Sequence, residues 1–187
     1  MAKLSTATLI GISGVMNAGK DTVANLLIAL RPRELRRYSF ATPLKAGAMA
    51  MFGWSQDQIE NREFKEAIDP RWGFSPRKAM QLLGTEYGRE RLRDDIWVHA
   101  GHNFHQESIK QSKGTIITDV RFENEAAWVR EQPNSILIHV MNPDHDYDAP
   151  IKHVSERGVG FVHGDMAITN YKYQGLSYLQ ETITNLW

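Results

Sequence analysis

Residues 6–30 read TATLIGISGVMNAGKDTVANLLIAL, and three patterns follow one another in this stretch. Residues 6–13 form a short, apolar and partly β-branched run, long enough for one buried parallel strand. Residues 23–30 carry apolar side chains at helical spacing. Between them, Gly14 and Gly19 lie five residues apart and Lys20 follows, which is the pattern G-x-x-x-x-G-K. Because a predicted strand precedes this pattern and a predicted helix follows it, it predicts a phosphate-binding loop.

The residue types of this loop suit an anionic ligand. Glycine permits the positive φ angles that turn backbone N–H groups toward a phosphate, and the N-terminus of the following helix points at the same anion. Lys20 adds a mobile positive charge for the outer phosphates. The residue after the lysine is Asp21 where Ser or Thr is usual, and Thr22 comes next. Either the Asp21 carboxylate or the Thr22 hydroxyl could hold Mg²⁺, and both alternatives stay open.

The composition predicts one globular domain. The chain has 187 residues, of which 42% are hydrophobic, and this is enough for a core at this length. The formal net charge of +0 argues against a broad binder of nucleic-acid polymers. The sequence has no cysteine, which excludes disulfides and thiolate metal sites. It also has no apolar run of membrane-spanning length and no signal-peptide pattern, so we expect a cytoplasmic protein without a membrane partner.

The rest of the chain alternates predicted strands with predicted helices. We expect strands at residues 36–40, 115–120, 136–141 and 166–169. We expect helices with N-caps at Thr42, Ser55 and Ser75, one beginning at Asp95, and others at residues 122–131 and 176–186. This alternation predicts an α/β P-loop fold with a parallel five-stranded sheet and helices on both faces. Residues 63–76 look irregular, which fits either a mobile substrate loop or a connection whose aromatic side chains pack against the core.

Polar segments follow the predicted strand ends. They are the phosphate loop, residues 41–45, 119–121 and 141–143, and Asn170. In parallel α/β sheets, ligands bind at the carboxyl ends of the strands. We therefore expect these segments to share one rim of the sheet.

Six stretches in this order carry a family resemblance. Residues 14–22 read GVMNAGKDT, 40–45 FATPLK, 75–77 SPR, 82–89 LLGTEYGR, 119–125 DVRFENE and 153–156 HVSE. Together they resemble the G-x-x-x-x-G-K-D-T, F-A-x-P-L-K, P-R, L-G-T-E-x-G-R, D-V-R-F-x-N-E and H-x-S-E segments of phage-type deoxynucleoside monophosphate kinases. The resemblance covers most of the chain, and Asp21 stands where this family also has Asp.

The resemblance implies the nucleoside monophosphate kinase version of the P-loop fold. It also implies Mg²⁺-assisted transfer of the γ-phosphoryl group of ATP to a deoxynucleoside monophosphate, and a chain that often forms homodimers. We expect residues 1–187 to form a single kinase domain with a helical substrate-binding and lid region at about residues 42–112. If the chain is encoded by a phage, its compartment would be the cytoplasm of the host cell.

Phosphoryl transfer chiefly needs positioning and positive charge on the phosphate oxygens, so we name lysines and arginines first. Lys20, Arg89 and Arg121 are the expected catalytic residues, and Arg121 directly follows a predicted strand. The expected contacts to ATP come from Gly14, Asn17, Ala18, Gly19, Lys20, Asp21, Thr22 and, beside the adenine, Asn170. The expected contacts to the acceptor come from Lys45, Trp72, Arg77, Glu86, Arg89 and Arg121.

Two further groups have alternative interpretations. Asp119 ends a predicted strand, so it joins Asp21 and Thr22 as a candidate Mg²⁺ ligand, or it caps the helix at residues 122–131. His99, His102 and His105 recur every third residue, and without a completing carboxylate pattern we expect them on a solvated helix face and not around a metal.

Two other functions fit part of the sequence. One keeps the fold and changes the acceptor, as in a kinase that resembles dephospho-coenzyme A kinase or phosphomevalonate kinase; the DVRFENE and LLGTEYGR stretches disfavour it. The other is a nucleotide-binding regulatory protein or GTPase-like switch, which the absence of N-K-x-D disfavours.

Overall fold

The structure is a computed structural model, and it describes residues 4–145, 153–156 and 158–186. Its backbone contacts divide the chain into two compact units. Unit 1 consists of Met1–Ser39 and Gly101–Trp187, and unit 2 consists of Phe40–Ala100. Each unit is described by itself.

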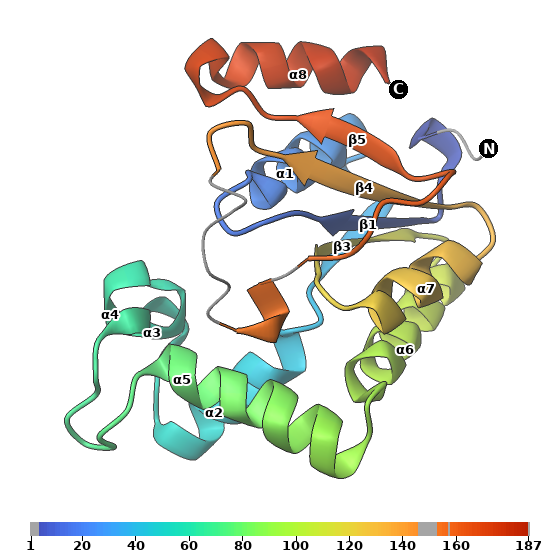
Figure 1. The fold of residues 1–187 in the computed structure, drawn as a ribbon. Helices are drawn as coiled ribbons and strands as arrows, with labels where there is room; N and C mark the ends of the chain where they lie inside the picture. Colours follow the sequence, from blue (N-terminus) through green and yellow to red (C-terminus); the bar gives the residue numbers. More distant parts are fainter. Residues whose placement is uncertain (1–3, 146–152, 157, 187) are drawn as a thin grey trace. The chain divides into compact units, whose positions relative to one another are not determined.

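Unit 1 contains a single parallel sheet (Figure 1). Its strands are β1 (Leu9–Ser13), β2 (Leu35–Tyr38), β3 (Gly114–Val120), β4 (Ser135–Met141) and β5 (Met166–Thr169). They lie in the order β2-β3-β1-β4-β5, and all four neighbouring pairs are parallel. The predicted α/β class and five-stranded parallel sheet are therefore confirmed.

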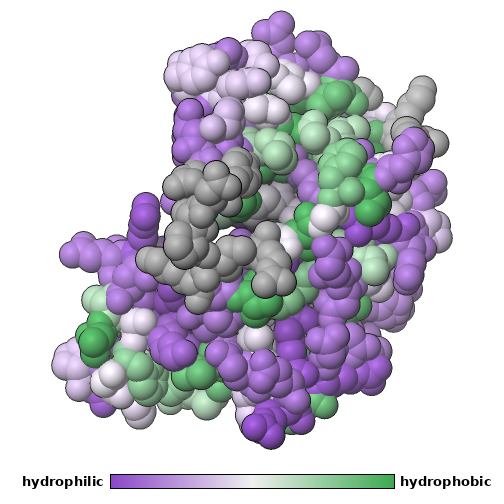
Figure 2. Space-filling model, in the orientation of Figure 1, coloured by the Kyte–Doolittle hydropathy of each residue, from purple (hydrophilic) through white to green (hydrophobic). Residues whose placement is uncertain are grey.

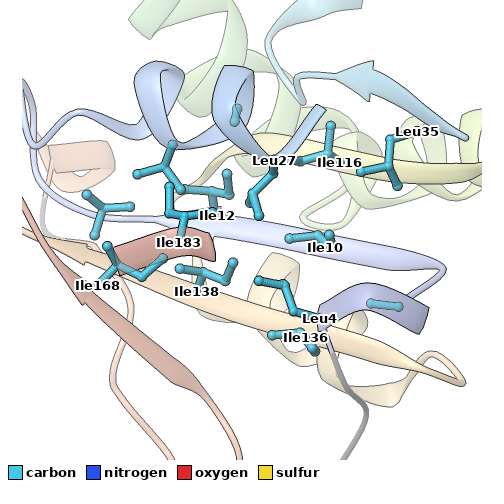
Figure 3. Close-up of a cluster of buried hydrophobic side chains, with 14 of the residues drawn as sticks. Leu4, Ile10, Ile12, Leu27, Leu35, Ile116, Ile136, Ile138, Ile168 and Ile183 are labelled. Atoms are coloured by element: carbon cyan, nitrogen blue, oxygen red, sulfur yellow. The ribbon is translucent and has the colours of Figure 1, made fainter. Parts of the chain in front are cut away.

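The main hydrophobic core lies on one face of this sheet, under α1 (Lys20–Leu30) and α8 (Gly175–Asn185). Ile10, Ile12, Ile138 and Ile168 point from the strands toward Leu27 and Ile183 of the helices (Figure 3). The helix α7 (Glu123–Glu131) covers the other face. A Cβ on Gly11 would lie 3.0 Å from the side chains of Leu137 and Val129, so glycine lets α7 approach β1 closely. Helices on both faces, as predicted, bury β1 and β3 completely.

The order of the connections between strands indicates where a ligand would bind to the sheet. From β1 the chain runs through α1 to the edge strand β2, whereas from β3 it runs through α7 to β4, on the other side of β1. Because β1 and β3 are neighbours, they form the switch point of a doubly wound sheet. Ligands of such sheets bind at the carboxyl ends of the two switch strands.

Unit 2 is helical, and its helices begin largely where the sequence predicts. They are α2 (Thr42–Phe52), α3 (Gln56–Glu60), α4 (Arg62–Glu66), α5 (Pro76–Gln81), the π-helix η2 (Leu82–Leu92) and the first residues of α6 (Ile96–Lys110). The Ser55 and Ser75 hydroxyls cap α3 and α5 by accepting from backbone N–H groups, which confirms both predicted N-caps. The predicted cap at Thr42 is wrong, because Thr42 is already helical and Ala41 precedes it as the N-cap.

Two parts of the segment predicted to be irregular, residues 63–76, are held by specific side-chain hydrogen bonds. Residues 62–66 are helical, because the Asn61 side chain accepts from the N–H of Phe64 at 2.8 Å and starts α4. Further along, the buried Asp69 carboxylate accepts from Trp54 Nε1 at 2.7 Å and from the Arg71 guanidinium at 2.6 Å. The Arg71 and Trp54 hydrogen bonds hold the pKa of Asp69 well below its usual range.

Trp72 and Phe74 of this segment contact another aromatic ring of unit 2, although Trp72 stays 43% exposed. The Phe52 ring contacts the rings of Trp54, Trp72 and Phe74, with centroids 4.6–5.4 Å apart. Trp72 also donates its indole N–H to the carbonyl of Phe52 at 3.1 Å. These contacts favour the packed connection over the mobile loop.

The prediction that all three α6 histidines face solvent is wrong for His105. His105 is 4% exposed, and its Nδ1 lies 3.0 Å from the Thr115 hydroxyl of β3. Trp128 of α7 contacts both His102 and His105 edge-on. His105 thus joins α6 to the sheet within unit 1.

Burial of His105 predicts a loss of stability in mild acid. Burial, helped by the neighbouring His102, lowers the pKa of His105 below 6.5. Between the folded and the unfolded pKa the unfolded chain binds more protons, so this contribution is intact above about pH 6.5 and is lost as the pH falls below it. Urea unfolding between pH 5 and 8 should show a slope in which the free energy of unfolding falls as the pH is lowered. It should shrink in His105→Gln and persist in the control His99→Gln, since His99 is exposed; an unchanged slope in His105→Gln would contradict the assignment.

The remaining short elements are the 3₁₀ turns η1 (Leu4–Thr6), η3 (Val154–Glu156) and η4 (Lys172–Gln174). On the face shown in Figure 2, hydrophobic side chains lie in separate groups among hydrophilic ones. Among the described residues, none of the helices has the length and apolar character needed to cross a bilayer. Part of the segment expected to be polar and irregular, residues 145–154, lies outside the described residues.

Candidate active site

The loop between β1 and α1 has the backbone geometry of an anion cradle. Gly14, Asn17 and Gly19 have φ angles of 146°, 62° and 101°, so the loop reverses direction at left-handed positions. A Cβ on Gly14 would overlap the carbonyl oxygen of Val140, and one on Gly19 would overlap the Asn170 side-chain amide. Both glycines are thus required by the backbone angle and by a close neighbour. The α1 helix begins at Lys20, immediately after this loop.

Lys20 lies over the loop that precedes it. Its Nζ donates to the carbonyl oxygens of Gly14 at 2.8 Å and Val15 at 2.9 Å. Burial and the positive charge of Arg121 lower the pKa of Lys20 to about 8, although Asp21 and Asp119 act in the opposite direction. The ammonium group is therefore held among charged groups at the carboxyl ends of β1 and β3, where an anionic phosphate would stabilise its charged form.

Asn170 connects the end of β5 to the phosphate loop. Its side-chain amide donates to the carbonyl of Ala18 at 2.9 Å, and its backbone N–H donates to Met141 at 2.9 Å. The next residue, Tyr171, contacts the rings of Tyr173 and Tyr178 at centroid distances of 5.7 and 5.8 Å. An aromatic group therefore directly follows the residue that was expected beside the adenine.

Asp21 is paired in a way that the sequence did not indicate. Its carboxylate accepts from the guanidinium of Arg37 on β2, and Arg37 also donates to the Asn25 side chain at 2.6 Å. The Asp21 side chain is 78% exposed despite this pair. Because the Asp21 carboxylate is exposed to solvent, it stays a candidate metal ligand beside Thr22.

Asp119 is buried at the carboxyl end of β3. Its Oδ2 accepts from the Ser39 hydroxyl at 2.6 Å. The interpretation of Asp119 as the helix cap is wrong, because Phe122 is the N-cap residue of α7. The Glu125 carboxylate instead accepts from the N–H groups of Arg121 and Phe122, at 2.7 and 3.1 Å. Arg121 is exposed and follows β3 directly, and its charge acts on Lys20.

Sequence reasoning missed three residues of this site: Ser39, Arg37 and Glu125. Only Glu125 had a usable signal, because an acidic residue three positions after the N-cap is typical of helix starts. Ser39 and Arg37 come from β2, and nothing in their spacing relates them to Asp119 or Asp21.

Removing the Glu125 carboxylate should destabilise unit 1. Glu125 is 2% exposed, so Glu125→Ala leaves two backbone N–H groups without their acceptor and should cost about 1–3 kcal/mol. Glu125→Gln keeps an acceptor oxygen and should cost less. Urea unfolding measures both, with Glu131→Ala at the exposed end of α7 as the control. A loss in Glu125→Ala no larger than that of the control would contradict this role.

The other predicted site residues lie in unit 2. Lys45 on α2 lies 3.7 Å from the Glu60 carboxylate, and Arg77 on α5 donates to Glu66 at 2.6 Å. Arg89 lies on η2, is 6% exposed and donates to the carbonyl of Asp94 at 2.8 Å. Glu86 lies one turn before it on the same π-helix. A π-helix is rare, and short π-helical turns often occur at functional sites.

The donor set at the carboxyl ends of β1 and β3 suits Mg²⁺ held partly by phosphate. Within the described residues there is no group of three or more His, Cys, Asp or Glu that could hold a metal. Mg²⁺ usually takes one or two carboxylates, with water and phosphate oxygens completing its shell. The buried Asp119 and the exposed Asp21 provide such carboxylates, and the charges of both raise the pKa of Lys20.

Comparison with known proteins identifies the family of this chain. Residues 55–183 match the family model described as deoxynucleotide monophosphate kinase. The chain is 28% identical to the deoxynucleoside-5'-monophosphate kinase of Escherichia phage T5, over 96% of this chain and 95% of that protein. It is 35% identical to a deoxynucleotide monophosphate kinase, named as putative, of Acanthamoeba polyphaga mimivirus, over 66% and 68% of the two chains. The chain therefore belongs to the deoxynucleotide monophosphate kinase family and is a phosphotransferase that uses a nucleotide phosphoryl donor.

Proposed function

We propose that this chain transfers the γ-phosphoryl group of ATP to a deoxynucleoside monophosphate, with Mg²⁺, and so forms a deoxynucleoside diphosphate and ADP. The observation that carries the proposal is the loop from Gly14 to Lys20, in which two sterically required glycines, a partly buried lysine and a helix N-terminus converge. Family membership selects the acceptor. Two relatives are named as kinases of deoxynucleoside or deoxynucleotide monophosphates.

In this proposal unit 1 binds the donor. Backbone N–H groups between Gly14 and Thr22, Asn17 and Ala18 included, would donate to the phosphate oxygens, and the Lys20 ammonium group would bind the β- and γ-phosphates. Asn170 borders the adenine. Its hydrogen bond to the Ala18 carbonyl joins the end of β5 to the phosphate loop. This bond would keep the adenine and triphosphate sites in a fixed position relative to each other.

Arginines would offset the repulsion between the two phosphate groups. Arg121 belongs to unit 1, and its charge already acts on Lys20. Arg77, Arg89 and Lys45 in unit 2 are the proposed contacts to the acceptor phosphate, and Trp72 and Glu86 the proposed contacts to its base. These residues lie within the region about 42–112 that we assign to acceptor binding.

Asp119, with Asp21 or Thr22, would hold Mg²⁺ together with phosphate oxygens. When bound, the ion neutralises charge on the β- and γ-phosphates. The acceptor is itself a phosphate, so the chain needs no strong general base. We place the reaction in the cytoplasm, which holds the nucleotide pool and would be that of the host for a phage protein.

A panel of acceptors tests the function. ADP release from ATP and Mg²⁺ should be fast with one or more deoxynucleoside monophosphates and slow with dephospho-coenzyme A and phosphomevalonate. Ribonucleoside monophosphates in the same panel measure the preference for deoxyribose. Tight ATP binding without turnover on any acceptor would instead favour a regulatory nucleotide-binding protein and overturn the proposal.

A further inference from the structure

The end of β3 extends beyond its regular pairing on both sides. Toward β2, the last pair of the ladder is Tyr38–Ile117, and β3 continues beyond it to Val120. Toward β1, the register shifts between Gly11 and Ser13, where Ser13 pairs with Val120, and β3 therefore carries one extra residue. Such a bulge redirects side chains and is common beside active sites. Asp119 lies in this irregular end.

A side-chain hydrogen bond joins this irregular end of β3 to the end of β2. The Ser39 hydroxyl donates to Oδ2 of Asp119 at 2.6 Å, across the ends of β2 and β3. This length is that of a charge-assisted O–H···O⁻ bond, which is about twice as strong as a neutral one. The bond occupies one carboxylate oxygen and thereby limits rotation of the carboxylate.

Ser39 is itself held in place by its neighbours. Tyr38, the residue before it, is buried, and its ring stacks on Phe104 with centroids 4.5 Å apart. Burial and the Asp119 charge raise the pKa of Tyr38 to about 12. The Thr118 hydroxyl adds a long 3.5 Å contact to the Tyr38 carbonyl. The end of β2 is thus a fixed support for the Ser39 hydroxyl.

We infer that Ser39 is a positioning residue, which holds the Asp119 carboxylate in the orientation that takes a divalent cation beside the bound nucleotide. The inference rests on the proposed function, in which Asp119 binds Mg²⁺. Groups that orient a metal ligand typically change metal affinity by about 10–100-fold when they are removed. A bond that only tied β2 to β3 would affect stability and leave metal affinity unchanged.

The test measures Mn²⁺ affinity of the full chain in the presence of ADP, by electron paramagnetic resonance titration. Ser39→Ala should weaken Mn²⁺ binding by about 10-fold or more. Ser39→Thr keeps the hydroxyl and should restore most of the affinity. Ser108→Ala is a matched control, because this buried hydroxyl donates at 2.9 Å to the Phe104 carbonyl of its own helix. In steady-state assays, Ser39→Ala should raise the Mg²⁺ concentration needed for half-maximal rate.

Several results would overturn the inference. The first is a Ser39→Ala variant that binds Mn²⁺ as tightly as the wild type while Asp119→Asn binds it weakly. The second is a Ser39→Thr variant whose Mn²⁺ affinity falls as much as that of Ser39→Ala. Unchanged affinity in Asp119→Asn would remove both the inference and the metal assignment. None of these outcomes touches the proposed reaction, which fails only if the wild-type chain does not phosphorylate a deoxynucleoside monophosphate.

Discussion

Replacement of Lys20 by alanine should lower kcat/KM for the phosphoryl transfer by about 10³-fold, which corresponds to about 4 kcal/mol of transition-state stabilisation. The Lys20 ammonium group is the proposed partner of the β- and γ-phosphates. It is partly buried and donates to backbone carbonyls of the phosphate loop, at 2.8 Å from Gly14 and 2.9 Å from Val15. Its charge is therefore worth more than that of a solvated lysine.

The loss should appear in turnover more than in folding. Far-UV circular dichroism should stay close to wild type and the urea midpoint should fall only slightly, because Lys20→Ala removes two hydrogen bonds to loop carbonyls and leaves the backbone pairing of β1 and α1 in place. Lys20→Arg should not restore the rate, since a planar guanidinium does not replace a compact ammonium in a tight loop. Lys110→Ala is the control, because that lysine is 75% exposed on α6. Near-normal turnover of a folded Lys20→Ala variant would refute the site.

The strongest predictions from the sequence came from patterns whose physical cause is local. The G-x-x-x-x-G-K spacing placed a strand, a phosphate loop and a helix correctly, because the glycine positions, Lys20 and the apolar periods all lie within one stretch of chain. Four of the five predicted strands contain β-branched residues, whereas residues 36–40 contain none. Ser55 and Ser75 caps followed from residue type alone.

The features that could not be predicted depend on contacts between distant segments. The Ser39 hydroxyl meets Asp119 across 80 residues of sequence, and only the alignment of β2 beside β3 brings them together. His105 has the spacing of a solvated helix, but the position of α6 against Thr115 buries it. The π-helix at Leu82–Leu92 depends on packing too: Trp97 donates to the Gly84 carbonyl at 2.8 Å, and a Cβ on Gly88 would lie 3.0 Å from its ring.

The second large effect is expected at Arg121. Arg121→Ala should lower kcat by about 10³-fold, because an arginine that stabilises the transferring phosphoryl group is worth about 10³–10⁵-fold in related reactions. Its backbone N–H is fixed by Glu125 at 2.7 Å, while its side chain is exposed at the end of β3 and free to meet a ligand from solvent. Arg121→Lys should recover only part of the rate, since lysine lacks the two-pronged geometry that matches phosphate oxygens.

A measurement without substrate tests the same placement. The positive charge of Arg121 lowers the pKa of Lys20, so Arg121→Ala should raise that pKa above its value of about 8. The pH dependence of Lys20 labelling by an amine-reactive reagent, read by mass spectrometry, would show the shift toward higher pH. Arg33→Ala, an exposed arginine between α1 and β2, should change neither the labelling profile nor the rate. If Arg121→Ala shifted the Lys20 profile but kept the wild-type rate, Arg121 would be a neighbour of the donor lysine without a role in transfer. If the rate fell but the Lys20 profile did not shift, Arg121 would act on the phosphates from a position farther from Lys20 than in the structure.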